Sequence, residues 1–127
     1  AYAFLPVGFL LSGAAVLWPA DIPVAAGLHA WLAGGVGLMT LAVMTRASLG
    51  HTGRDLHAGW VETAVYLAVG LAALARIAAG LGASDIWRDL AATGWVAGFA
   101  IFALAYGPIL TGPRLAPRRA NPTARKA

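Results

Sequence analysis

Four long apolar stretches, separated by short polar segments, make up most of this sequence. Each is long enough to form a helix in a hydrocarbon core about 30 Å thick. None alternates apolar and polar residues with the period of two that a barrel strand requires, and an open sheet edge is not tolerated in lipid. The pattern therefore predicts an all-α fold, a four-helix transmembrane bundle whose helices are residues 2–18, 24–45, 55–81 and 85–110.

Turn-forming residues mark the ends of these helices. Residues 19–23 contain two prolines, which stop the first helix. The polar segment 46–54, which contains two glycines, is expected to be a loop. Asp55 is a candidate N-cap for the third helix, and Ser84 or Asp85 for the fourth.

The composition agrees with a location in a bilayer. Hydrophobic residues make up 60% of the 127 residues and charged residues only 11%, and the mean hydropathy is +0.74. These values exclude a disordered chain and leave no length for a soluble catalytic domain. The absence of cysteine removes disulfides, thiolate zinc sites and iron–sulfur clusters. The net charge of +4 does not indicate nucleic-acid binding, because a basic face on a polar fold is missing.

Basic residues are concentrated at one end of the predicted bundle. Of the nine arginines and lysines, two lie in residues 46–54 and five in the proline-rich tail 114–127, whereas Arg76 and Arg88 lie at the other end. The positive-inside rule then places both termini in the cytoplasm, with residues 1–113 as the membrane domain and the basic tail as a cytoplasmic segment. The aromatic residues expected at the interfaces agree with this orientation: Trp18, Trp31 and Trp87 at the outer one, and Tyr2, Trp60 and Tyr106 at the inner one.

Small residues recur four positions apart in the second and fourth helices. Such patterns mark faces where helices pack closely in lipid. They could pack inside this chain or against a membrane partner, either another subunit or a second copy. The residues that form these faces are Ala30, Gly34, Gly37, Gly94 and Gly98.

Polar residues within the membrane are costly and are the first candidates for function. His29 lies five residues into the second helix, and Arg76 lies about as far from the outer end of the third, so the two share a depth. His29 is a candidate ligand or proton carrier, or it forms a hydrogen bond with a nearby carbonyl. Arg76 has a functional role, or its side chain extends to the interface.

Two further groups of polar residues allow two interpretations each. Glu62, Tyr66 and Arg76 share one face of the third helix, which favours a polar seam facing the bundle over a proton or ligand path. His51, His57 and Glu62 could bind copper or zinc, but His57 and Glu62 lack the spacing of strong helical metal sites, which favours a polar loop at headgroup level.

One geometric exclusion follows from the second helix. His51 lies 22 residues after His29, on the order of 30 Å along a continuous helix. The two histidines cannot ligate the same iron. A bis-histidine haem at the level of His29 would therefore need its second histidine from another chain.

The segment from Met39-Thr40 through Met44-Thr45-Arg46-Ala47 to Gly50-His51-Thr52-Gly53-Arg54 resembles the signature of the NnrS family. These are bacterial polytopic membrane proteins described as containing haem and copper and linked to nitric-oxide metabolism. The remaining hydropathy is compatible with the carboxy-terminal part of such a protein, and family members have many more helices than four. By position, His29 and His51 match the motif histidines of the family.

The resemblance implies a multi-pass protein of the bacterial inner membrane that is a haem- or metal-associated component of nitric-oxide handling. His29 is then the candidate haem axial ligand. The alternative is a cofactor-free accessory subunit, which packs against a larger respiratory or photosynthetic membrane complex. A stand-alone transporter is disfavoured because four helices with one polar seam offer little cavity. We do not expect this chain alone to be an enzyme.

Overall fold

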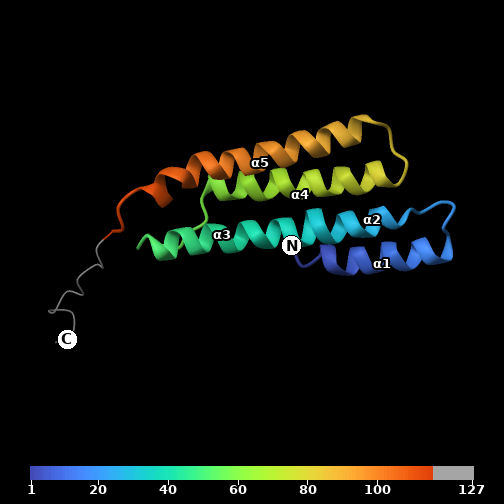
Figure 1. Cartoon of the computed structure of the whole chain (residues 1–127), viewed down its shortest axis with the longest axis horizontal. Coiled ribbons are helices and arrows are strands. Elements are labelled where there is room, and N and C mark those ends of the chain that lie inside the picture. The colour runs from blue at the N-terminus through green and yellow to red at the C-terminus, as the bar shows by residue number, and fades with distance from the viewer. Residues whose placement is uncertain (116–127) are drawn as a thin grey trace.

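The computed structural model describes residues 1–115, and within them the chain is helical and contains no strand (Figure 1). The predicted tail lies almost entirely outside these residues. Three consecutive elements, α2, η1 and α3, form one continuous helix over Val24–His51. The elements are α1 (Phe4–Leu17), α2 (Val24–His29), the π-helical η1 (Ala30–Val36), α3 (Gly37–His51), α4 (Trp60–Gly80) and α5 (Ile86–Thr111).

Three of the four helices are long and apolar enough to cross a membrane: Val24–His51, Trp60–Gly80 and Ile86–Thr111. The first helix, α1, has 14 residues. At 1.5 Å per residue it extends about 21 Å, less than a hydrocarbon core of about 30 Å. The predicted number of four helices is therefore confirmed, and three of these helices are long enough to span a membrane.

The second helix is longer than its predicted range and ends at His51 instead of residue 45. Residues 46–51 are therefore helical, and the hydroxyls of Thr45 and Thr52, which flank them, bond to helix carbonyls. Thr45 Oγ1 donates to Ala42 O at 3.1 Å, and Thr52 Oγ1 donates to Ser48 O at 2.6 Å. After the C-cap residue Thr52 the chain turns at Gly53, whose φ of +73° is a conformation that favours glycine.

The N-cap prediction at Asp55 is wrong, because α4 begins at Trp60. Its first turn is closed by a side chain inside the helix: the amide of Gly59 donates to Glu62 Oε2 at 2.7 Å. At the start of α5, Asp85 occupies the N-cap position but forms no capping bond. Its carboxylate instead accepts a hydrogen bond from Arg88.

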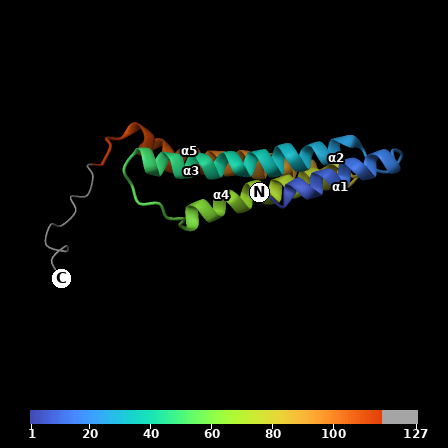
Figure 2. The ribbon, with the colours of Figure 1, turned by 90° about the horizontal axis from the view of Figure 1, so that it is seen from below.

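The helices pack as two hairpins. One hairpin is formed by α4 and α5, and the other by α1 with α2 and η1. Both α2 and η1 also lie against α4. Figure 1 shows the order α5, α4, the long helix and α1 across the molecule, and Figure 2 shows the same arrangement from below. The apolar core where α3, α4 and α5 meet consists of Leu38, Leu41, Leu49, Val65, Val69, Phe102 and Tyr106.

The small-residue faces are used inside the chain. A Cβ added to Gly98 would lie 2.5 Å from Val69 Cγ2, and one added to Gly94 would lie 3.1 Å from Ala72 Cβ, so both glycines of α5 pack against α4. On the long helix, Gly34 faces the ring of Phe4 and Gly37 faces that of Trp95, while Ala30 is fully buried. The glycine faces of α5 and the long helix are therefore not free surfaces for a partner.

We expect Gly98→Leu to weaken the α4–α5 hairpin, because the new side chain would overlap Val69. Overpacking of this kind costs about 1–3 kcal/mol of stability, which a lower Tm by circular dichroism in detergent would register. Gly107→Leu is the control, since nothing lies within 4 Å of a Cβ at that position of the same helix. Equal losses of Tm in the two variants would contradict the packing role of Gly98.

Candidate functional site

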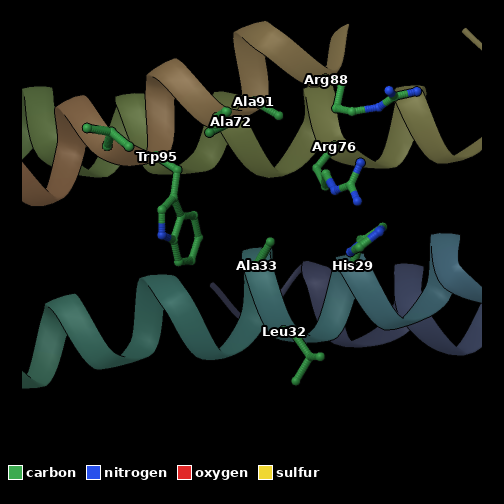
Figure 3. A pocket seen from close by; sticks show the side chains of 10 residues that line it. His29, Leu32, Ala33, Ala72, Arg76, Arg88, Ala91 and Trp95 are labelled. Atoms are coloured by element: carbon green, nitrogen blue, oxygen red, sulfur yellow. The ribbon is translucent and has the colours of Figure 1, made fainter. Parts of the chain in front are cut away.

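A pocket of about 510 Å³ lies between α2, η1, α4 and α5, toward the end of the bundle that holds the α4–α5 turn. Its volume falls within the range of small-molecule and cofactor sites. The three basic residues of the lining come from three elements: His29 from α2, Arg76 from α4 and Arg88 from α5. Figure 3 shows Arg76 reaching from α4 toward His29, and Trp95 pointing from α5 toward the helix that carries His29.

Small side chains make the space for this pocket. Alanines line it from η1, α4 and α5, and Ala72 and Ala91 are 3% and 5% exposed. The larger apolar lining residues are Leu32, Trp95 and Val96. The pocket is thus an apolar slot with one basic residue on each of α2, α4 and α5. Its lining contains no carboxylate.

The backbone changes its winding directly after His29. Residues Ala30–Val36 form a π-helix, whose hydrogen bonds join residues five apart. Each such turn holds one residue more than an α-turn, so the helix faces before and after it are shifted around the axis. His29 then faces α4, where a Cβ at Gly80 would lie 3.8 Å from His29 Cδ2. π-Helical turns are rare and occur frequently at functional sites.

The residues predicted as a polar seam on α4 are divided between two ends of the bundle. Arg76 lines the pocket with His29. Toward the other end, Tyr66 Oη lies 2.7 Å from Thr45 Oγ1. Val69 and Ala73, which separate these two polar places, are both completely buried. The seam therefore does not form a continuous polar path along the helix.

Glu62 joins three segments at the end opposite the pocket. Its Oε1 accepts a hydrogen bond of 2.6 Å from Tyr106 Oη on α5, while its Oε2 accepts the bond from the Gly59 amide. Tyr106 is 1% exposed, so it is a core residue and the prediction that it lies in the inner aromatic belt is wrong. The signal for burial was its spacing: Trp95, Phe99, Phe102 and Tyr106 follow one face of a helix.

The three residues considered as a copper or zinc site take separate positions. His51 is exposed at the end of α3, and His57 Nδ1 lies 3.2 Å from Asp55 O in the following loop. Both oxygens of Glu62 already accept hydrogen bonds. Within residues 1–115, no three His, Cys, Asp or Glu side chains come together as a metal-binding group.

We expect Tyr106→Phe to destabilise the protein, because it removes the hydroxyl that donates a hydrogen bond to Glu62. A hydrogen bond to a charged group contributes about 1.5–3 kcal/mol, and the loss should appear as a lower Tm. Tyr2→Phe makes the same chemical change at a tyrosine that is 74% exposed and should leave Tm unaltered. A Tyr106→Phe protein as stable as wild type would show that the bond is not stabilising.

Comparison with known proteins identifies one family. The model of the NnrS protein family matches residues 1–114. No curated protein and no solved structure matches the chain. The family match covers all the described helices, the pocket between α2, η1, α4 and α5, and the hydrogen bonds of Glu62. The chain belongs to the NnrS family.

Proposed function

We propose that this NnrS-family membrane protein is a haem-associated component of nitric-oxide handling, with His29 as an axial ligand in the pocket. The observation that carries the proposal is a single imidazole on the wall of an apolar slot of about 510 Å³. Neutral imidazole is a normal haem ligand, and an apolar surrounding is what a porphyrin face requires.

The residues around His29 fit such a group. Neither ring nitrogen of His29 forms a hydrogen bond with another residue of the described chain, so a nitrogen is free to coordinate. The alanines of the facing helices leave a slot between them, and Trp95 supplies an aromatic surface at one end. Copper, which the family resemblance also implies, finds only one imidazole here, so we assign the pocket to haem.

The pocket lining contains one histidine, so a second histidine ligand would come from another chain. His51 lies on the same continuous helix, 22 residues from His29, on the order of 30 Å away. When bound, haem supplies an iron with a position open to nitric oxide. In this proposal, His29 would hold the iron and the apolar walls would contact the porphyrin.

The test is a reduced-minus-oxidised absorption spectrum of the purified full-length protein and of His29→Ala. We expect a Soret band in the wild type and its loss or shift in the variant, because the variant lacks the ligating nitrogen. His57→Ala is the matched control, since it removes an exposed loop histidine. An unchanged band in His29→Ala would overturn the ligand role.

A cofactor-free accessory subunit is the second candidate function. It is favoured by the sparse packing of α1, which lies against α2 and η1 and leaves large apolar side chains exposed, including Leu10 at 73% and Val16 at 78%. Such a surface contacts lipid or another membrane protein. Absence of a Soret band, together with stoichiometric copurification with a larger membrane complex, would favour this function over haem binding.

We further propose that the chain crosses the bacterial inner membrane with the loop between α3 and α4 in the cytoplasm. Seven of the nine basic residues lie in residues 46–54 or the tail, which supports this orientation. The absence of cysteine makes single-cysteine labelling clean. Ala58→Cys should react only from the cytoplasmic side and Ala20→Cys only from the periplasmic side; the reverse result would overturn the orientation.

A further inference from the structure

We propose that the pocket selects an apolar ligand bearing a carboxylate, and that Arg76 binds this carboxylate. The inference rests on the proposed function in that, if haem is the ligand, the carboxylates are its propionates. Arg76 would recognise the acid group of the ligand whether or not the ligand contains iron.

The charge of the lining is unbalanced. His29, Arg76 and Arg88 face the pocket, and no acidic side chain lines it. Within residues 1–115 there is one ion pair, in which Arg88 Nη2 lies 2.8 Å from Asp85 Oδ1. Both of these side chains are largely exposed, at 62% and 86%. Arg88 is therefore a solvated rim charge that already has a partner, and it contributes little to binding.

Arg76 differs from Arg88 in both respects. It is half-buried, and its guanidinium has no ion-pair or hydrogen-bond partner among the described residues. It lies four residues before the end of α4 and about 6 Å from that end along the axis. Figure 3 shows its side chain extended across the gap toward His29. An anion in the pocket would give this guanidinium the partner that it lacks.

The walls define the rest of the ligand. Ala33, Ala72, Ala91 and Trp95 present apolar surface over most of the pocket. A small inorganic anion would leave this surface unfilled, and an uncharged apolar molecule would leave Arg76 unpaired. The planar guanidinium matches a carboxylate through two parallel hydrogen bonds. The pocket therefore fits a molecule that combines an apolar body with a carboxylate at one end.

The test compares each acid with its own ester, so that only the charge changes. The full-length protein in non-ionic detergent is titrated with haem and with haem dimethyl ester, and the Soret band is followed. We expect wild type to bind haem about tenfold more tightly than the ester, as befits a hydrogen bond to a charged group. Arg76→Gln should lose this preference while keeping ester affinity and the shape of the band.

Two variants control for charge and folding. Arg46→Gln removes an arginine from the opposite end of the long helix and should keep the preference for the acid. Arg76→Lys keeps the charge without the planar fork and should retain part of it. Equal affinity of wild type for acid and ester, or equal weakening of both ligands by Arg76→Gln, would overturn the proposal.

A second probe keeps this test separate from haem binding. A brominated fatty acid and its methyl ester are titrated against tryptophan fluorescence, with Trp95→Phe identifying the signal from the pocket. If no Soret band forms but the acid quenches Trp95 more strongly than the ester, and Arg76→Gln removes the difference, haem binding fails and the carboxylate site stands. If neither acid is preferred over its ester, the carboxylate site fails.

Discussion

The close contact between α4 and α5 is the interaction on which the rest of the structure depends. Lipid gives helices no hydrophobic reason to associate, so they hold together by van der Waals contact between small residues. Gly94 and Gly98 allow α5 to approach Ala72 and Val69 of α4. With that face fixed, Trp95 projects from α5 onto Gly37 of the long helix. The hairpin thereby sets the wall of the pocket that faces His29.

The polar side chains discussed above differ in their hydrogen bonding between the two ends of the bundle. At the end near the α3–α4 loop, Tyr66 bonds with Thr45, and Glu62 bonds with Tyr106 and the Gly59 amide. These bonds satisfy groups that lipid would otherwise penalise. At the other end, His29 and Arg76 share an apolar pocket and form no hydrogen bond with another described residue. The first arrangement stabilises the fold, whereas the second leaves His29 and Arg76 available to the ligand that we propose.

The sequence was sufficient for those features that depend on hydropathy and on distance from a helix end. It predicted four helices, the proline turn after α1, and a common depth for His29 and Arg76, which the structure brings to one pocket. It failed where side-chain bonding or packing decides the result. The long helix continues through the polar residues up to His51, and α4 begins only at Trp60, where Glu62 accepts a hydrogen bond from the Gly59 amide. The apolar residues of Ala30–Val36 predict a helix but not its π-helical winding.

The segment that resembles the family signature and the candidate ligand occupy opposite ends of one helix. Thr45 and the Gly53 turn build the end near the loop, where Leu115 N donates to Thr52 O and a Cβ on Gly53 would lie 2.8 Å from Leu115 O. His29 lies 22 residues earlier, before the π-helical turns. Thr45, Thr52 and Gly53 of this segment thus have structural roles at their own end of the helix. The chemistry that we propose belongs to the pocket, where His29 provides a nitrogen and Arg76 a charge.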